Sequence, residues 1–319
     1  MKFDINFYGK ELDISKGSSV AIGFFDGVHR GHKKIFHSAV LQKENLSLGN
    51  SVAVTFDIHP LTLISSKKVP KMINTFDQRV EYILESGIDT VAVVKFDEVF
   101  SQLEPRDFVK YLLKEKLFAK SVTVGANFRF GRDRKGNAEL LFGLQSEYDF
   151  TMNEIPSVLI GGGPVSSTRI RAAVSESRMI DAKKFLGNYF TLRGIVGKGY
   201  QIGTQLGYPT ANLLIAGNQL LPGNGVYVVA SYIDDKIFFG GCNVGVRPTF
   251  GIHDVSIETH FVYWNGDLYG RELNYYFIEK IRDEMQFSSP NDLIANLNKD
   301  IAFVKEYSDN NELFNEVLE

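Results

Sequence analysis

The chain has 319 residues, more than a single hydrophobic core usually serves, so we expect two domains. Hydrophobic residues make up 44% of it and charged residues 23%, a balance that excludes a disordered chain. The formal net charge of −3 gives no global attraction for nucleic acid or for an anionic membrane surface. A small anionic ligand would therefore need local basic groups.

The single cysteine, Cys242, cannot form an internal disulfide or a thiolate metal cluster, which fits a reducing compartment. No apolar run approaches the roughly 20 residues that a membrane helix needs, and the N-terminal residues lack the apolar core of a signal peptide. We therefore expect a cytoplasmic enzyme or ligand-binding module, with neither a membrane nor nucleic acid as partner.

The first 160 residues alternate short apolar runs with helical patterns. Four runs are β-branched and almost continuously apolar: 19–25, 51–56, 89–96 and 121–125. Such runs are typical of parallel strands buried on both faces. Between them, Thr75 and Gln78 form a capping box before one helix, and Pro105 opens another over 105–117. This order predicts a doubly wound α/β domain.

Three polar loops follow strands of this predicted sheet. They are "GFFDGVHRGH" (23–32), "TFDIHP" (55–60) and "GANFRFG" (125–131). In doubly wound sheets, ligands bind beyond the carboxyl ends of the strands, near the point where the strand order reverses. We therefore expect a ligand pocket where these loops meet.

The second half of the chain has a different pattern. Five strands separated by glycine-rich turns are expected, at 190–197, 225–233, 236–245, 256–263 and 272–281. An all-β barrel or sandwich is predicted. A last helix should begin after Ser289, with Pro290 at its first position. One stripe of it is apolar, formed by Leu293, Leu297, Ile301 and Val304.

His29 and His32 lie three residues apart at the start of an expected helix. Their spacing puts both on one face, beside the partial positive charge of the helix N-terminus. The glycines around them would let a phosphate approach the backbone. A plain turn into a helix, with both histidines exposed, explains the same residues. Zinc is not favoured, because no third ligand has a matching spacing.

A second polar stretch, "SSTRIRAAV" (166–174), follows a glycine-rich segment. It places the hydroxyls of Ser166, Ser167 and Thr168 at an expected helix N-terminus, with Arg169 and Arg171 just inside, as would suit a polyphosphate. A capped surface helix with solvated arginines is the alternative.

The second half carries three candidate features. Thr210 and Asn212 in "GYPTANL" offer hard oxygen ligands for Mg²⁺, although a plain turn before a strand explains them too. The glycine-rich "GKGYQIGTQLG" (197–207) could fold over phosphates or be a loop. Alternation places Glu258 on one face of its strand with Ser256 and His260, where a carboxylate usually meets solvent.

Together these motifs resemble those of a known family. "GFFDGVHRGH" and "SSTRIR" are similar to the paired HxGH and SSTxxR motifs of the nucleotidylyltransferase superfamily. With "TFDIHP" and "VGANFRFG", the first half resembles the adenylyltransferase module of prokaryotic bifunctional FAD synthetases. The second half, through "LGYPTANL", "NVGVRPTFG", "IETHF" and "DLYGRELNYYF", resembles the riboflavin kinase module. The match covers nearly the whole chain, in the family's order.

The resemblance implies roles in the first module. His29 and His32 would act in adenylyl transfer from ATP. ATP would also contact Gly23, Phe24, Asp26, Gly27, Ser167, Thr168 and Arg171. FMN would lie near Asp57, His59, Pro60 and Asn127.

It also implies roles in the second module. Glu258 would be the general base, and Thr210 and Asn212 would hold Mg²⁺. ATP would contact Gly197, Lys198, Gly203, Pro209, Thr210 and Asn212. Riboflavin would lie near Asn243, Arg282 and Phe287.

The family implies a bifunctional enzyme that phosphorylates riboflavin to FMN and adenylylates FMN to FAD. The adenylyltransferase domain would span 1–184 and the kinase domain 185–319, with ATP and Mg²⁺ in use. A nucleotidylyltransferase for another phosphate ester, and a flavin-binding regulator, are disfavoured by the presence of Thr210, Asn212, Glu258 and both histidines. The oligomeric state is left open by the sequence.

Overall fold

The computed structural model describes residues 3–64, 69–198, 207–215, 217–249 and 252–310. The chain divides into two compact units. The first unit comprises Met1–Pro70 and Thr75–Ser167, and the second comprises Lys71–Asn74 and Thr168–Glu319. The chain therefore passes between the units at three points, and the second unit is discontinuous in sequence.

A six-stranded sheet organises the first unit, with strand order β1-β4-β3-β2-β5-β6. The strands are β1 Ile5–Gly9, β2 Ser18–Ile22, β3 Asn50–Phe56, β4 Thr90–Val94, β5 Ala119–Gly125 and β6 Thr151–Ile155. β1 is antiparallel and the other strands are parallel. The order reverses at β2, since β3 lies on one side of it and β5 on the other. The loops after β2 and β5 thus begin at the switch point.

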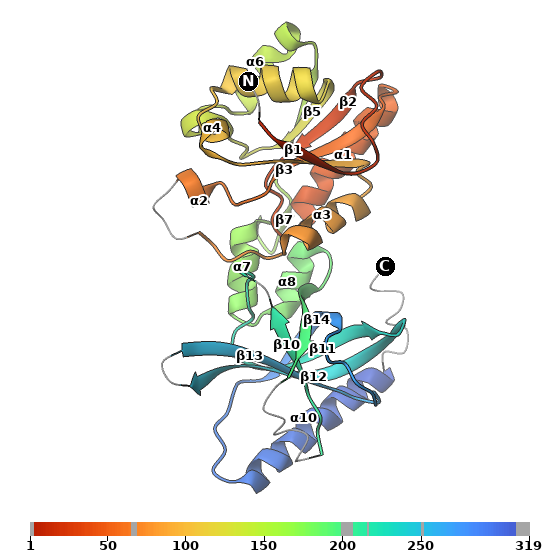
Figure 1. The fold of residues 1–319 in the computed structure, drawn as a ribbon, viewed down its shortest axis with the longest axis vertical. Helices are drawn as coiled ribbons and strands as arrows, with labels where there is room; N and C mark the ends of the chain where they lie inside the picture. Colours follow the sequence, from red (N-terminus) through yellow and green to blue (C-terminus); the bar gives the residue numbers. More distant parts are fainter. Residues whose placement is uncertain (1–2, 65–68, 199–206, 216, 250–251, 311–319) are drawn as a thin grey trace. The chain divides into compact units, whose positions relative to one another are not determined.

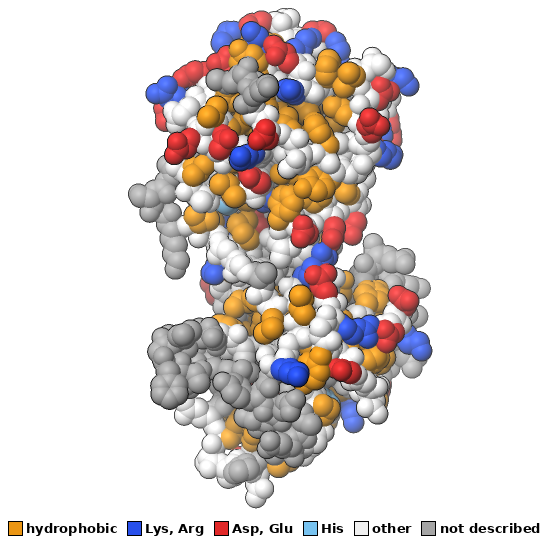
Figure 2. All heavy atoms as spheres, viewed as in Figure 1, with side chains coloured by type: hydrophobic (Ala, Val, Ile, Leu, Met, Phe, Trp, Pro, Cys, Tyr) orange, Lys and Arg blue, Asp and Glu red, His pale blue; other side chains and the backbone are white. Residues whose placement is uncertain are grey.

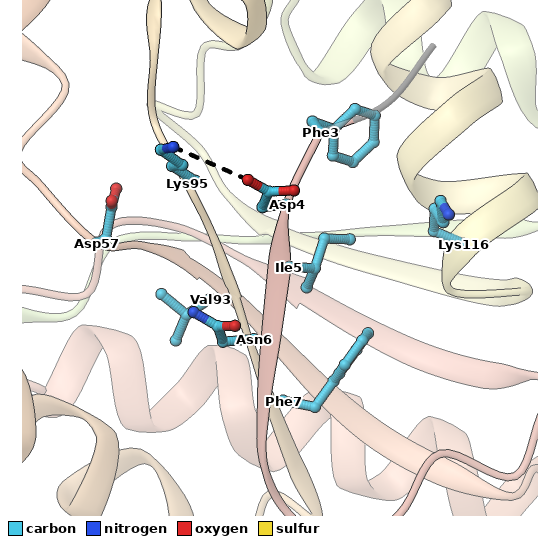
Figure 3. A pocket seen from close by; sticks show the side chains of 9 residues that line it. All are labelled: Phe3, Asp4, Ile5, Asn6, Phe7, Asp57, Val93, Lys95 and Lys116. Carbon is cyan, nitrogen blue, oxygen red and sulfur yellow. Dashed lines mark ion pairs between the residues drawn. The ribbon is translucent and has the colours of Figure 1, made fainter.

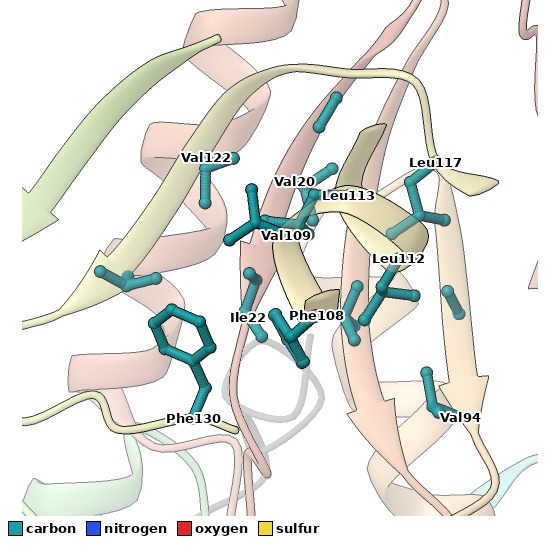
Figure 4. Close-up of a cluster of buried hydrophobic side chains, with 14 of the residues drawn as sticks. Val20, Ile22, Val94, Phe108, Val109, Leu112, Leu113, Leu117, Val122 and Phe130 are labelled. Carbon is teal, nitrogen blue, oxygen red and sulfur yellow. The ribbon is translucent and has the colours of Figure 1, made fainter. Parts of the chain in front are cut away.

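Helices cover both faces of this sheet (Figure 1). α1 (Arg30–Asn45) and α3 (Phe76–Glu85) pack on one face. The other face is covered by α5 (Pro105–Asp107), the π-helix η1 (Phe108–Lys116) and α6 (Ala138–Tyr148). Figure 4 shows the side chains of η1 and Phe130 gathered over the strands. The short elements are α2 Leu61–Ile64, α4 Glu98–Ser101, η2 Arg132–Arg134, β7 Leu159–Ile160 and β8 Gly163–Pro164.

The second unit contains a closed barrel in the order β10-β13-β12-β11-β14-β9. Its strands are β9 Phe190–Gly197, β10 Ala211–Ile215, β11 Gly225–Ile233, β12 Lys236–Thr249, β13 Ile252–Phe261 and β14 Glu272–Arg282. The helices are α7 Ser167–Ser175, α8 Met179–Leu186 and α10 Pro290–Asn310. The barrel, one of the two predicted all-β architectures, is confirmed.

Alternate residues of the barrel strands enter its interior. Tyr227, Cys242 and Tyr275 are fully buried there, and burial raises the pKa of the Cys242 thiol to about 12. On the outer face, Val228 and Ala230 pack with Ile301 and Val304 of α10. The predicted apolar stripe of the last helix is thus confirmed. Ser289 caps this helix, since its Oγ accepts from the backbone N–H of Asp292 at 3.2 Å.

Charges of both signs are interspersed on the molecular face in Figure 2, in keeping with the small net charge. Among the described residues, no helix is both long and apolar enough to cross a membrane.

Candidate active sites

The loop after β2 has an unusual backbone. Phe25 and Val28 have φ values of 59° and 39°, although neither is a glycine, and Gly27 has 87°. A positive φ at a β-branched residue costs energy and is common at functional sites. At Gly23, a Cβ would lie 2.6 Å from the ring of Phe25, so a larger residue would displace that ring. The conformation of this loop therefore favours glycine at positions 23 and 27.

His29 forms the N-cap of α1, and its Nδ1 accepts from the backbone N–H of His32 at 3.3 Å. The two imidazoles stack with centroids 3.5 Å apart. Because Nδ1 of His29 accepts, its proton lies on Nε2. The expected helix start and the predicted pairing of the histidines are both present. They are not exposed, however: His29 is 5% accessible, and the Nδ1 atom of His32 is buried.

Burial keeps both imidazoles neutral. It lowers the pKa of His29 to about 4. The pKa of His32 is lowered well below its usual value, first by burial and then by the repulsion that a protonated His32 would meet from a protonated His29. At neutral pH each ring therefore offers one N–H donor and carries no full charge.

Ser167 lies against this loop, since its Oγ donates to the backbone carbonyl of Asp26 at 2.9 Å. Asp26 is only 2% accessible. Thr168 and Arg171, the other predicted members of this site, belong to the second unit. There Nε of Arg171 donates to the carbonyl of Lys71 at 2.8 Å.

The predicted flavin residues lie on the loops after β3 and β5. Oδ1 of Asp57 accepts from the backbone N–H groups of Ile58 and Phe96, both at 2.8 Å. His59 meets the ring of Phe24 edge-on, with centroids 4.6 Å apart, and its Nδ1 accepts from the N–H of Leu61. The loop after β2 therefore touches the loop after β3.

The other two predicted flavin residues lie on the same two loops. Pro60 follows His59 and is half-buried, and Asn127 is exposed on the loop after β5. A separate cavity of about 520 Å³ runs along β1. Of the predicted site residues, only Asp57 is among those lining it, beside a Lys95–Asp4 ion pair of 3.8 Å (Figure 3).

Sequence reasoning missed Arg79 in this unit. Its side chain is 3% accessible, and its guanidinium donates to the carbonyl of Phe56 at 2.5 Å. The guanidinium carbon lies 4.2 Å from the centroid of the Phe24 ring. A signal was available, because Arg79 stands three residues after Phe76 and four before Ile83, on the apolar stripe of α3.

In the barrel, five residues lie in one row across consecutive strands. Asn212 is opposite Glu258, Glu258 is opposite Asn243, Asn243 is opposite Val226, and Val226 is opposite Arg282. Directly opposite residues share a face of the sheet, with Cβ atoms about 5 Å apart. Four of the five are predicted site residues, drawn from β10, β13, β12 and β14.

A cavity of about 280 Å³ lies on this row, between the outer barrel face and α10. The predicted residues that line it are Thr210, Asn243, Glu258, Arg282 and Phe287. Leu293 and Leu297 of α10 form its apolar wall, and Glu258 is half-buried there. The structure thus brings the predicted base together with the predicted flavin residues.

Arg282 is held in this cavity by α10. Its Nη2 lies 2.8 Å from Oδ2 of Asp300, and Nε also donates to that carboxylate. The guanidinium lies 5.8 Å from the ring centroid of Phe287. Asp300, 5% accessible, was not predicted.

A second cavity of about 370 Å³ adjoins the first. Pro209, Thr210, Trp264 and Asp267 are among the residues lining it. Thr210 and His260 line both cavities. The ring Nδ1 of His260 lies 2.9 Å from the carbonyl of Pro209, which can only accept, so this nitrogen donates.

The predicted glycine-rich flap is described only in part. Gly197 ends β9 opposite Asn212, and Lys198 is exposed. Gly203 lies outside the described residues.

Comparison with known proteins also divides the chain into two parts. The FAD synthetase family model matches residues 12–169, and the riboflavin kinase family model matches residues 186–308. A bifunctional riboflavin kinase/FMN adenylyltransferase of Buchnera aphidicola is 38% identical over 92% of this chain and 95% of the relative. The chain belongs to the bifunctional riboflavin kinase/FMN adenylyltransferase family. The Escherichia coli member is 34% identical, over 92% of this chain and 93% of its own.

A solved structure has the same fold. The crystal structure titled macrolide-efflux protein from Streptococcus pneumoniae superimposes with a TM-score of 0.83 and 29% identity, over 91% of this chain and 94% of that one. As a family member, the chain is an enzyme with a FAD synthetase domain and a riboflavin kinase domain. It makes FMN from riboflavin and FAD from FMN, with ATP as co-substrate. The predictions of family and function are confirmed.

Proposed function

We propose that riboflavin phosphorylation takes place at the row on the outer barrel face. The observation that carries this proposal is the register that aligns Asn212, Glu258, Asn243 and Arg282 in one row, with Glu258, Asn243 and Arg282 lining one cavity. Riboflavin occupies that cavity, with its ring system against Phe287 and the apolar wall of α10. ATP occupies the adjoining cavity, so Thr210, which lines both, lies where the two substrates meet.

In the kinase step, Glu258 takes the proton of the ribityl hydroxyl as its oxygen attacks the γ-phosphorus of ATP. The γ-phosphate passes to riboflavin, and ADP leaves. Such a transfer requires in-line positioning more than covalent chemistry. The protonated carboxyl then returns its proton to solvent.

Thr210 and Asn212 are the residues that would hold Mg²⁺. The hydroxyl and the amide oxygen are hard ligands, and Glu258 stands opposite Asn212, so this part of the row suits a small hard cation. When bound, Mg²⁺ neutralises charge on the ATP phosphates. Gly197, Lys198, Gly203 and Pro209 are proposed to contact the same nucleotide.

We further propose that FAD synthesis takes place at the loop after β2. A phosphate oxygen of FMN attacks the α-phosphorus of ATP, and pyrophosphate leaves. The Nε2–H of His29 and an N–H of His32 donate to the oxygens that gain charge. The backbone of Gly23, Phe24, Asp26 and Gly27 and the side chains of Ser167, Thr168 and Arg171 hold the nucleotide. Asp57, His59, Pro60 and Asn127 hold FMN.

The two functional domains are proposed to span 1–184 and 185–319. By packing, the second compact unit already takes up the chain at Thr168, so these limits refer to the residues that each reaction uses. A cytoplasmic enzyme, with flavins and adenine nucleotides as its partners, fits the single cysteine and the small net charge.

Two substitutions test the assignment of each step. Glu258→Gln keeps the shape of the carboxylate and removes the proton acceptor, so FMN formation should fall roughly a hundredfold or more. His32→Ala should lower FAD formation from supplied FMN by about a hundredfold, because one preorganised donor is lost. Both rates are measured by separating the flavins chromatographically.

Each variant is the control for the other. Glu258→Gln should make FAD from FMN at the normal rate, and His32→Ala should make FMN from riboflavin at the normal rate. If Glu258→Gln forms FMN at the wild-type rate, Glu258 is not the base of the kinase step. If His32→Ala forms FAD at the wild-type rate, His32 has no role in FAD synthesis beyond the start of α1.

A further inference from the structure

Arg79 is a buried cation that the two reactions described above do not use. It lies on α3, 3% accessible, at the carboxyl ends of β2 and β3. Its one hydrogen bond among the described residues is to the Phe56 carbonyl, and its Nε has no partner there. Burying a charge with so few partners is costly. Because its burial is unfavourable and it lies at the edge of a proposed substrate site, we looked for a role of Arg79 in the reaction.

Its surroundings join the two loops that serve different substrates. The guanidinium carbon lies 4.2 Å from the Phe24 ring centroid, and that ring meets His59 edge-on at 4.6 Å. Phe24 belongs to the proposed ATP loop, and His59 belongs to the proposed FMN loop. The Phe56 carbonyl that accepts from Arg79 is at the end of β3, where the FMN loop begins.

The charge of Arg79 is retained in this position. Burial lowers its pKa to about 10, against the opposing effect of Asp26 and Asp57, so the group is protonated at neutral pH. These carboxylates come from the same two loops. A planar guanidinium can stack on an aromatic ring and hydrogen bond in its own plane at the same time, which an ammonium cannot do.

We propose that Arg79 is a positioning residue for FAD synthesis, which clamps the Phe24 ring against His59 and so sets the ATP and FMN loops relative to each other. It touches neither substrate. This inference rests on the proposed assignment of the two loops to ATP and FMN.

The test uses the full-length enzyme with Arg79→Met and Arg79→Lys. Misplacement of a bound reactant by about 1 Å can cost a hundredfold, so Arg79→Met should lower kcat/KM for FAD synthesis about 10- to 100-fold, with a raised KM for FMN. The kcat/KM of Arg79→Lys should lie within about threefold of that of Arg79→Met, because the stacking of the planar guanidinium on Phe24, and not its charge, positions the ring. Riboflavin phosphorylation in the same preparations should be unchanged.

A double-mutant cycle with Phe24→Leu separates clamping from general destabilisation. If Arg79 acts through Phe24, adding Arg79→Met to Phe24→Leu should lower kcat/KM by no more than about twofold further. Arg106→Met is the matched control, because Arg106 is an exposed arginine of the same unit, paired with Glu147 at 2.7 Å. It should leave both activities unchanged.

Independent, multiplying effects of Arg79→Met and Phe24→Leu would overturn the proposal, as would full activity in Arg79→Lys or an unchanged KM for FMN. If Arg79→Met does not fold, Arg79→Lys and Phe24→Leu decide the matter by their KM for FMN. If His32→Ala loses FAD synthesis while the Arg79 variants make FAD at the normal rate, only the inference about Arg79 is refuted. Normal activity in His32→Ala would refute the site assignment on which it rests.

Discussion

The histidine pair is neutral at physiological pH because the loop after β2 buries it. An imidazole that is neutral in the folded protein and titrates normally in the unfolded chain makes stability depend on pH. The unfolded chain binds more protons below a pH of about 6.5, so protonation favours unfolding there. The stabilisation is complete above that pH and is lost as the pH falls towards the folded pKa of about 4 for His29.

This linkage gives a measurable pH dependence. Between pH 6.5 and pH 4, the free energy of unfolding should fall by an amount of about 3 kcal/mol attributable to His29. His29→Gln, which cannot titrate, should show a smaller decrease over the same range. Urea unfolding at a series of pH values measures both. If the free energy of unfolding depends on pH in the same way in the two proteins, His29 has the same pKa in the folded and unfolded states.

His260 offers a second test on a single residue. It donates to the Pro209 carbonyl, immediately before the proposed Mg²⁺ ligand Thr210. His260→Leu removes this donor, and losing one hydrogen bond of about 1 kcal/mol should raise the Mg²⁺ concentration for half-maximal kinase activity by about fivefold. His260→Asn, with an N–H near the position of Nδ1, should restore most of the difference.

The Mg²⁺ titration distinguishes orientation of Thr210 from a structural role, because general destabilisation would lower the maximal rate and leave the Mg²⁺ midpoint in place. FAD synthesis from supplied FMN is the internal control. Equal midpoints in His260→Leu and the unaltered enzyme would exclude this role for the hydrogen bond.

At the scale of elements, the strength of the local pattern decided what could be predicted. β9 and β11 begin and end where the apolar runs 190–197 and 225–233 do. The capping box of Thr75 and Gln78 is present at α3. β1 and β6 were missed, because edge strands bury little of their surface and carry no apolar run.

Other features left no pattern to detect. The helix expected over 105–117 is mostly a π-helix, whose apolar positions do not differ visibly from those of an α-helix. The alignment of Asn212, Glu258 and Asn243 depends on strand register, which no single strand encodes. The role proposed for these three residues could be inferred only through the family resemblance.

The helices α7 and α8 belong to the barrel unit by their packing. α8 packs on β9 and β14, and the hydroxyl of Tyr227 donates to Ser177 Oγ at 2.7 Å between the two helices and β11. A fragment of residues 168–319 should therefore unfold at a temperature at least about 5 °C above that of a fragment of 187–319. Differential scanning calorimetry of both fragments measures this, with the intact chain as reference. Equal unfolding temperatures would show that the two helices add nothing to the barrel.

Over the whole molecule, the two activities and the two compact units have different limits. The SSTRIR motif begins in the first unit at Ser166 and continues in the second from Thr168. Its residues are proposed to serve the adenylyltransferase reaction, whereas α7, the helix that carries most of them, belongs from Thr168 onward to the unit that contains the kinase barrel.

The discontinuity of the second unit also has a consequence for synthesis on the ribosome. The backbone of Met72 pairs with that of Asn218 and Leu220, and the carbonyl of Lys71 accepts from Arg171. These partners are made up to about 150 residues later, a delay on the order of ten seconds at common elongation rates. During that interval Lys71 and Met72 lack these hydrogen-bond partners, although all residues of the first unit have been made once Ser167 is added. Translation speed across the second half of the gene thus sets how long this segment waits for its partners.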